Sequence, residues 1–193
     1  MNMIEHFELK DGRVIEIKIL TREDYEQNNN YEYVHNWHHQ VNTYLNYEFN
    51  PENLERDRKD WFENYIESEN EILIGALFNG RIIGTTALRL NLRVKKRAHV
   101  GEWGIAIHPD FHNQGLGKKL LTILEDMAKE KGLKKLEADY YVENLSAEHL
   151  YLNKMNYEVE GRRKFAALLK DGTYTDRVSI GKIIDDSLLN QKK

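Results

Sequence analysis

The sequence contains no cysteine and only 2 prolines in 193 residues. The absence of cysteine excludes a disulfide scaffold, thiolate metal ligands and a catalytic thiol. No apolar run approaches the roughly 18 residues that a membrane-spanning helix requires. The first ten residues also lack the apolar segment of a secretory signal peptide. We therefore expect a cytoplasmic protein without a membrane partner.

The sequence also lacks an excess of charge of either sign. It has 28 Lys and Arg against 32 Asp and Glu, a formal net charge of -4. Proteins that bind nucleic acid usually carry a net basic surface, so the composition argues against that partner. Hydrophobic residues make up 40% of the chain, which is enough for a core. The length favours a single domain over residues 1–193, with a core of about 10–184 and a polar tail over 185–193.

The pattern of apolar residues predicts a mixed α/β protein. Runs of alternating or β-branched residues predict strands over 14–20, 72–78, 82–92, 98–107, 136–142, 157–169 and 173–184. Helical spacing predicts helices over 21–45, 51–66, 116–130 and 144–155, the first of them capped by Thr21 and interrupted at residues 28–30. Asn79-Gly80 and Asp171-Gly172 predict tight hairpin turns. The strand–helix–strand unit over 98–142 predicts a parallel, right-handed crossover.

The segment most informative about function lies between a predicted strand and an amphipathic helix. Residues 108–119 have the sequence H-P-D-F-H-N-Q-G-L-G-K-K. The start of a helix exposes unpaired backbone N–H groups at the positive end of the helix dipole. Gly115 and Gly117 remove side chains that would block an approaching ligand. The segment therefore predicts a phosphate site.

Three kinds of phosphate loop compete for this segment. A Walker loop requires glycine at His112 and Ser or Thr at Lys119, so that interpretation fails twice. A dinucleotide fingerprint requires a third glycine at Leu120 and a preceding N-terminal strand. The remaining pattern, R/Q-x-x-G-x-G/A, binds the pyrophosphate of coenzyme A, with His112 here at the first position.

With that pattern in place, residues 72–184 resemble the GNAT superfamily of N-acetyltransferases. The segment N-L-S-A-E-H-L-Y-L-N-K-M-N-Y-E-V-E-G-R, Asn144 to Arg162, is similar to the family's next motif, N-x-x-A-x-x-x-Y-x-x-x-G-F. Two departures are His112, where the family usually has Arg or Gln, and Met155-Asn156-Tyr157, where it usually has L-G-F. The resemblance implies a mixed sheet of about six or seven strands, splayed at the cofactor site and flanked by about four helices.

The resemblance further implies transfer of an acetyl group from acetyl-CoA to a primary amine by direct attack in a ternary complex, without a metal. Glu102 matches the general base of many members, and Tyr151 matches the acid that protonates the departing thiolate. Asn144 matches a position that contacts the pantetheine arm. The full set expected to bind the cofactor is Ile105, Ala106, Ile107, His112, Asn113, Gln114, Gly115, Leu116, Gly117, Lys118, Asn144 and Ala147.

Each assignment has a structural alternative. Glu102 as a solvated strand residue would leave the base role to a water relay, Tyr151 suits a core aromatic, and Asn144 suits a helix cap. Two other protein classes also stay open. A non-catalytic acyl-CoA sensor would keep the loop without the acid and base, and a nucleotide-phosphate enzyme would prefer ATP.

The acceptor is expected to be a small amine, polyamine, amino acid or peptide N-terminus. In the resemblance, the helices over 21–66 form one wall of its site, with Tyr31, Tyr44 and Glu48 as candidate contacts because aromatic and acidic groups attract cationic amines. His35 and His39 have a spacing that suits metal ligands, but no third ligand is evident, so we expect no metal. The sequence leaves open whether the chain acts alone or as a homodimer.

Overall fold

The computed structural model describes residues 4–41, 44 and 51–192. The chain forms two compact units, and it passes through each of them twice. Unit 1 comprises Met1–Leu88 and Gly104–Leu120, and unit 2 comprises Arg89–Trp103 and Leu121–Lys193. Strand β5 (Val100–Ile107) and helix α4 (Leu116–Glu130) therefore contribute residues to both.

Unit 1 contains a run of neighbouring strands in the order β1-β2-β3-β4. Their bounds are β1 (Ile4–Glu8), β2 (Val14–Ile19), β3 (Glu71–Phe78) and β4 (Arg81–Leu90). Strand β2 pairs antiparallel with both β1 and β3. The predicted turn between β3 and β4 is confirmed, since Asn79 and Gly80 have φ of 51° and 73°, as a two-residue hairpin turn requires.

Strand β1 was not predicted, and the reason is its pattern. The sequence IEHFE is largely polar, and the strand lies at the end of the run with β2 as its neighbour. An edge strand buries little surface and so carries a weak hydrophobic signal. With β1, the described residues form eight strands, β1 to β4 and then β5 to β8. About six or seven strands were expected, and β1 is the additional one.

The helices of unit 1 follow β2. They are α1 (Arg22–Glu26), α2 (Asn30–Val41) and α3 (Leu54–Trp61), with short turns η1 (Gln27–Asn29), η3 (Pro51–Asn53) and η4 (Phe62–Ile66). The predicted cap is confirmed: the Asp24 carboxylate accepts from the Thr21 N–H and hydroxyl at 2.9 and 2.8 Å. The predicted interruption is also confirmed, because Asn28 has φ of 52° and separates α1 from α2.

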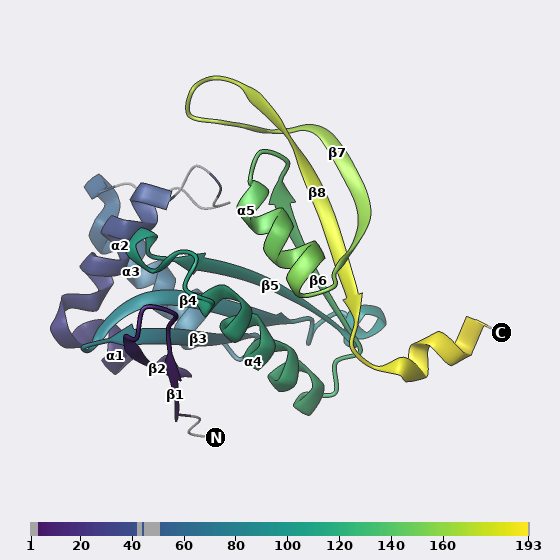
Figure 1. Ribbon diagram of the computed structural model, residues 1–193, viewed down its shortest axis with the longest axis horizontal. Coiled ribbons are helices and arrows are strands. Elements are labelled where there is room, and N and C mark those ends of the chain that lie inside the picture. Colours follow the sequence, from purple (N-terminus) through teal and green to yellow (C-terminus); the bar gives the residue numbers. More distant parts are fainter. Residues whose placement is uncertain (1–3, 42–43, 45–50, 193) are drawn as a thin grey trace. The chain divides into compact units, whose positions relative to one another are not determined.

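The core of unit 1 joins these helices to β3 and β4. Its members are Leu20, Tyr25, Tyr31, Val34, Trp37, Phe62, Leu73, Leu77 and Ile82. Trp37 is 1% exposed, and its indole N–H donates to the Ile82 carbonyl at 3.1 Å. Figure 1 shows α1, α2 and α3 gathered beside these strands. The aromatic residues that the sequence placed in these helices thus serve largely to hold them on the sheet.

Unit 2 contains the first half of β5 with β6 (Lys135–Tyr141), β8 (Tyr174–Ile183) and β7 (Glu158–Leu168), neighbours in that order. Strand β5 pairs parallel with β6 over three residues, from Val100 opposite Lys135 to Glu102 opposite Glu137. This confirms the predicted parallel connection through α4. The pairs β6–β8 and β8–β7 are antiparallel.

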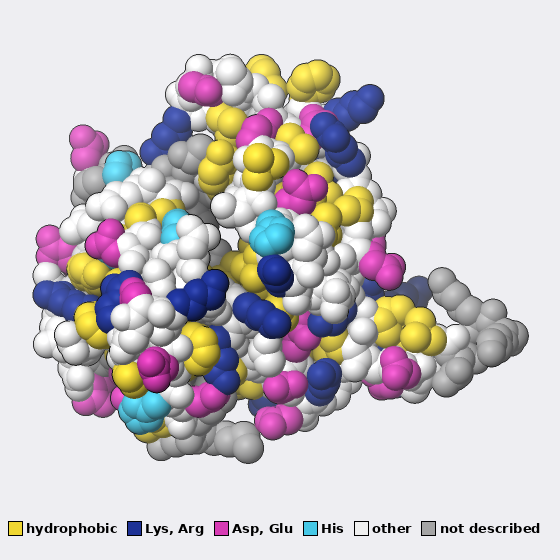
Figure 2. All heavy atoms as spheres, in the orientation of Figure 1, with side chains coloured by type: hydrophobic (Ala, Val, Ile, Leu, Met, Phe, Trp, Pro, Cys, Tyr) yellow, Lys and Arg dark blue, Asp and Glu magenta, His cyan; other side chains and the backbone are white. Residues whose placement is uncertain are grey.

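One short helical segment of unit 2 bears on function. It consists of α5 (Leu145–Glu148) and the π-helical turn η7 (His149–Lys154), and it lies alongside β6 and β8 (Figure 1). Further turns are η5 (Lys95–Arg97) and η8 (Asp186–Lys192), the latter in the expected polar tail. At the far end of the β7–β8 hairpin, apolar and basic side chains lie together on the surface (Figure 2). No helix in the described part of the chain is long and apolar enough to cross a membrane.

Candidate active site

The predicted phosphate loop of unit 1 has the backbone geometry of an anion site. The turn η6 (Pro109–Phe111) precedes it, and α4 follows. The Lys119 N–H donates to the Gly115 carbonyl at 3.1 Å. The N–H groups of Leu116 and Gly117 lie in the first turn of α4, where the helix itself supplies no preceding carbonyl to accept from them. They are two adjacent donors at the positive end of the helix dipole.

The conformation of the loop requires its glycine. Gly115 has φ of 87°, and Asn113 has φ of 61°. A side chain on Gly115 would be strained by that φ. A Cβ built there would have the Phe7 ring at 3.9 Å and is otherwise not closely approached by the described residues. The space above the first turn of α4 is therefore open to a ligand.

His112 supports the loop through its own contacts. Its Nε2 lies 2.8 Å from the Ile107 carbonyl oxygen, and its N–H donates to the Pro109 carbonyl at 3.0 Å. The imidazole thus closes the loop back onto the end of β5. The family position usually carries Arg or Gln, and here a histidine fixes the backbone by a local bond.

The second half of β5 is tied to β4 within unit 1. The Thr86 hydroxyl donates to the Gly104 carbonyl at 2.9 Å, and the His108 N–H donates to the Ile83 carbonyl at 2.8 Å. The residues expected to face the pantetheine arm, Ile105, Ala106 and Ile107, are half-buried. No atom of the described residues lies within 4 Å of a Cβ built on Gly104. This stretch of strand therefore has room beside it.

Gln114 is the one expected cofactor residue with a buried, unpaired group. Its amide oxygen is buried and has no hydrogen-bond partner among the described residues. A buried acceptor without a donor costs free energy, roughly 1–3 kcal/mol. The carbonyl of Gln114 is occupied by the Lys10 N–H at 3.4 Å. Unpaired donors at the helix start and an open glycine position fit a diphosphate, the charged group of coenzyme A.

In unit 2, Tyr151 lies in a buried aromatic cluster. It is 8% exposed and belongs to the π-helical turn η7. Its ring meets Trp103 edge to face at 4.9 Å and Tyr140 at 6.0 Å. Burial raises the pKa of Tyr151 above its ordinary value, so its hydroxyl keeps its proton throughout the neutral range. The side chain therefore carries a proton that it could donate during a reaction.

Trp103 and Tyr157 were not predicted as site residues. Tyr157 packs on Trp103 at 5.2 Å, and burial raises the pKa of Tyr157 as well. Close by, Lys182 donates to both carboxylate oxygens of Glu125 at 2.8 and 2.7 Å. The sequence signal for Trp103 was its place directly after Glu102, where an aromatic side chain must point to the opposite face of the strand.

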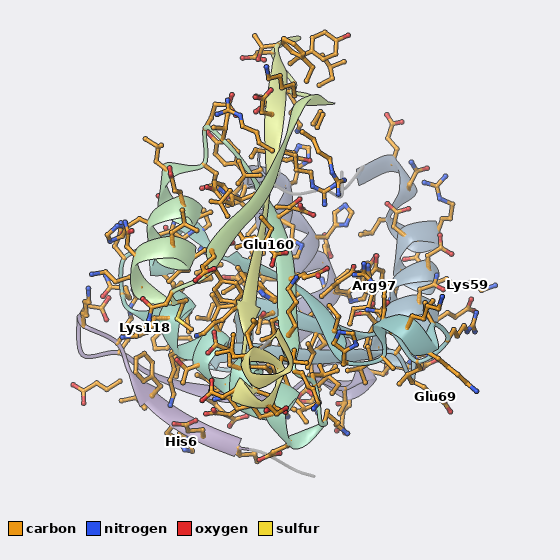
Figure 3. The ribbon with its side chains drawn as sticks, turned by 90° about the vertical axis from the view of Figure 1, so that its right-hand side faces the viewer. His6, Lys59, Glu69, Arg97, Lys118 and Glu160 are labelled. Carbon is orange, nitrogen blue, oxygen red and sulfur yellow. The ribbon has the colours of Figure 1, made fainter. Side chains whose placement is uncertain are left out.

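Glu102 is paired and partly exposed. Its carboxylate accepts from Arg97 Nη2 at 3.0 Å, and its side chain is 41% exposed. The same Arg97 nitrogen donates to Glu137 at 2.8 Å, and Lys135 reaches Glu137 at 2.9 Å. Burial opposes ionisation of Glu137, but the bonds from Lys135 and Arg97 hold its pKa below the usual value. Figure 3 labels Arg97, the residue that joins the two carboxylates.

Asn144 acts as the helix cap that the sequence allowed. Its side-chain oxygen accepts from the Ala147 N–H at 3.1 Å at the start of α5. Ala147 is 7% exposed. The capping bond uses the side-chain oxygen of Asn144. Contact between Asn144 and the pantetheine arm stays a prediction.

The candidate acceptor residues differ in their surroundings. Tyr31 is 6% exposed within the core of unit 1, which favours a packing role. Tyr44 is 40% exposed, and Glu48 lies outside the described residues. His35 is buried, and desolvation lowers its pKa, whereas His39 is exposed. The described residues contain no group of three or more His, Asp or Glu able to hold a metal ion.

Comparison with known proteins identifies the class. The model of the family described as "Acetyltransferase (GNAT) family" matches residues 31–157. The match covers well over half of the chain, so the chain belongs to the GNAT acetyltransferase family and is an acyltransferase. A curated relative, the L-amino acid N-acetyltransferase AaaT of Escherichia coli (strain K12), is 24% identical over 124 residues, covering 64% of this chain and 75% of the relative.

Solved structures have the same fold. A GNAT acetyltransferase from Streptococcus pneumoniae has a TM-score of 0.68 at 24% identity, covering 89% of this chain and 99% of that one. An N-acetyltransferase from Staphylococcus aureus Mu50 has a TM-score of 0.74 at 20% identity, with the same coverage. A putative acetyltransferase from Salmonella typhimurium, solved with its cofactor acetyl-CoA, has a TM-score of 0.72 at 18% identity, covering 89% and 95%.

Proposed function

We propose that the protein transfers the acetyl group of acetyl-CoA to a primary amine by direct attack in a ternary complex. The observation that carries the proposal is the start of α4, where the helix supplies no acceptor for the N–H groups of Leu116 and Gly117 and Gly115 leaves the approach open. When bound, acetyl-CoA supplies an acetyl group already activated as a thioester. Membership of the GNAT family supports the same chemistry.

Residues of unit 1 would hold the cofactor. The N–H groups of Leu116 and Gly117 would donate to the diphosphate beside Lys118, with the backbone aimed by Asn113, Gly115 and the His112 side chain. Charge-assisted bonds of this kind are about twice as strong as neutral ones. The backbone of Ile105, Ala106 and Ile107 would align the pantetheine arm and donate to the developing oxyanion. Gln114 would gain a partner for its buried oxygen.

Tyr151 of unit 2 would provide the proton for the departing thiolate. Because a thiolate of ordinary pKa near 8.5 is a weaker base than a tyrosinate, the transfer is uphill by itself, and the tyrosinate would regain its proton from solvent. A proton donor must hold its proton at neutral pH. The raised pKa of Tyr151 meets that requirement. Asn144 and Ala147, at the start of the same helical segment, would contact the pantetheine amide.

The amine must lose a proton before it attacks. An amine of pKa near 10.4 pays roughly 4–5 kcal/mol to expose its lone pair at pH 7. Glu102 is the proposed base, directly or through a water. Its bond to Arg97 holds the carboxylate in place, which favours a relay in which water carries the proton between amine and carboxylate.

The acceptor class proposed first is the free amino acid. A curated relative is named for L-amino acids, and such a substrate presents a primary amine beside a carboxylate. Tyr44 is proposed to face it, with Tyr31 packed in the core of unit 1. Because the family match runs from residue 31 to 157, through both units, we further propose that the units make up a single acetyltransferase domain.

An amine panel tests the proposal. Purified protein, acetyl-CoA and each of the common L-amino acids, several polyamines and short peptides would be assayed for free thiol, with the acetylated product identified by mass spectrometry. We expect release of coenzyme A with at least one amine and none above background without it. Tight binding of coenzyme A with no release for any amine would instead favour an acyl-CoA sensor, and preference for ATP would favour a nucleotide enzyme.

A further inference from the structure

The hairpin formed by β1 and β2 contacts the phosphate loop, although it lies outside the segment that matches the family. The match begins at residue 31, whereas the hairpin covers Ile4 to Ile19. Both the hairpin and the loop belong to unit 1. Figure 3 labels His6 on β1 and Lys118 in the first turn of α4.

Arg13 makes the most specific of these contacts. Its Nη2 donates to the Asp110 carbonyl at 2.9 Å. Its guanidinium carbon lies 3.9 Å from the centre of the Phe111 ring, a short cation–π distance. Arg13 thus grips two consecutive residues of the turn that leads into the loop.

The guanidinium is itself held in position. Asp11 accepts from Arg13 Nε at 2.9 Å and lies 2.7 Å from Nη2. The bond to Arg13 lowers the pKa of Asp11, so this carboxylate remains charged in the neutral range. The Arg13 guanidinium bonds to the Asp11 carboxylate on one side and to the Asp110 carbonyl on the other, so it has little freedom to rotate. A lysine has a single ammonium group and cannot reproduce that geometry.

Three more contacts reach the far end of the loop. The Lys10 N–H donates to the Gln114 carbonyl at 3.4 Å. Phe7 lies beside Gly115, and Glu5 forms an ion pair with Lys119. The hairpin therefore contacts the chain both before and after the residues whose N–H groups are proposed to bind phosphate.

Phe111 connects the Arg13 contact to the interior. It is 5% exposed, and its ring meets Phe78 of β3 at 5.7 Å and His108 at 5.9 Å. The imidazole of His108 accepts from the Asp110 N–H at 3.2 Å. The turn is thus clamped from inside by aromatic packing and from outside by Arg13.

We propose that the β1–β2 hairpin preorganises the coenzyme A loop and that Arg13 is its principal positioning residue. Binding of a diphosphate is strengthened when the donors already hold the bound geometry, because the ordering cost has been met in folding. Arg13 acts through the turn at Asp110 and Phe111 and does not touch the phosphates. The inference rests on the proposed function, since it assumes that coenzyme A binds the loop.

The test compares Arg13→Ala and Arg13→Lys with Arg22→Ala. Arg22 is a matched control in the same unit, since its guanidinium also lies over an aromatic ring, Phe62 at 4.7 Å, and bonds to Glu26 and Glu67. By calorimetry we expect Kd for coenzyme A to rise about tenfold for Arg13→Ala and about fivefold for Arg13→Lys, with Arg22→Ala unchanged. Arg13→Lys at the wild-type Kd would overturn the positioning role.

Two readouts separate positioning from other roles. The ratio of variant to wild-type Kd should stay constant between about 0.05 and about 0.5 M KCl, whereas direct phosphate contact would shrink it as salt screens the charge. With S-acetylpantetheine, which has no diphosphate, kcat/KM should be the same for Arg13→Ala and wild type. A loss with this substrate as well would indicate general damage and overturn the proposal. If wild-type protein fails to bind coenzyme A, the proposed function itself fails.

Discussion

The phosphate loop of unit 1 and the aromatic cluster of unit 2 carry out their proposed tasks with different parts of the chain. The loop uses backbone: the N–H groups of Leu116 and Gly117 at the start of α4 and a glycine at φ of 87°. The cluster uses side chains, with Tyr151 fixed between Trp103 and Tyr140. A backbone site tolerates changes of side chain that keep the conformation, which explains how His112 can occupy a position where the family usually has Arg or Gln.

The same difference governs the response to pH. Peptide N–H groups do not titrate in the physiological range, so the loop should bind anions alike over a wide pH range. Side chains titrate, and their behaviour depends on their neighbours: burial raises the pKa of Tyr151, whereas Glu102 is exposed and bound to Arg97. Changes of backbone conformation should therefore abolish anion binding by the loop, whereas removal of single side-chain atoms should abolish the function of the cluster.

The largest effect is expected from Gly115→Glu. The new side chain would be strained at positive φ and would place a carboxylate in front of the N–H donors. We expect Kd for coenzyme A to rise at least about a hundredfold, equivalent to about 2.7 kcal/mol. Calorimetry on the folded variant would measure the change.

Gly172→Glu is the matched control for backbone strain. Gly172 has φ of 83°, and no atom of the described residues lies within 4 Å of its built Cβ. This variant should lose stability as Gly115→Glu does and yet bind coenzyme A within about twofold of wild type. Equal losses of affinity in both would remove the loop from the cofactor site.

The second largest effect is expected on kcat, from the removal of one oxygen atom. Tyr151→Phe keeps the ring in its cluster and deletes the proton donor, so kcat should fall about thirtyfold to a hundredfold, at the lower end of general acid catalysis. Kd for acetyl-CoA should stay within about twofold. Tyr157→Phe removes a buried hydroxyl from the same cluster and should leave kcat nearly unchanged. Wild-type turnover in Tyr151→Phe would exclude it as the acid.

The sequence predicted best those features that local chemistry determines. The Asn79-Gly80 turn, the cap at Thr21 and the parallel pairing of β5 with β6 all lie where residue type and spacing placed them. The phosphate loop belongs with these, because a glycine beside a helix start is visible in one short segment.

Features that depend on distant partners escaped prediction. Strand β1 is a polar edge strand stabilised by its neighbour β2. The partner of Glu102 is an arginine from the turn η5, and the burial of Tyr31 depends on packing against Phe62, 5.9 Å away. None of these contacts leaves a local pattern, because each depends on how neighbouring elements pack and not on residue type and spacing alone.

Unit 1 also contains a buried titratable side chain, His38. It should make the stability of the unit depend on pH, whereas anion binding by the loop should not. Desolvation lowers the pKa of His38 to about 3 in the folded protein, whereas a histidine in the unfolded chain has a pKa near 6.5. Below pH 6.5 the unfolded state therefore binds a proton at His38 that the folded state does not bind. The free energy of unfolding falls as the pH decreases toward 3. Between pH 7 and pH 5 the loss from His38 should be about 2 kcal/mol, from about 1.5 units at 1.36 kcal/mol each.

Urea unfolding at several pH values would measure this loss. His38→Gln should unfold with a smaller dependence on pH between about 5 and 7, whatever its absolute stability. His39→Gln is the control, because His39 is exposed on the same helix and should leave the dependence as in wild type. An unchanged dependence in His38→Gln would show that His38 accepts a proton in the folded state.

The smallest effect is expected at Glu102, where the structure offers an internal control. Glu102 and Glu137 are register partners on β5 and β6, and both accept from the same Arg97 nitrogen. Glu102→Gln and Glu137→Gln therefore both disturb Arg97, and Glu137→Gln also weakens a bond to Lys135; surface ion pairs contribute only about 0–1 kcal/mol to stability. The two variants differ in whether the proposed base has been removed.

If Glu102 takes the amine proton through a water, Glu102→Gln should lower kcat/KM about threefold to tenfold at pH 7, because the relay loses its final acceptor. The deficit should shrink as the pH rises toward the pKa of the amine, where more of the acceptor is already neutral. Glu137→Gln should match wild type across the profile. Equal deficits in the two variants would assign the effect to Arg97 and leave deprotonation to solvent, so that the side-chain chemistry of unit 2 would rest on Tyr151 alone.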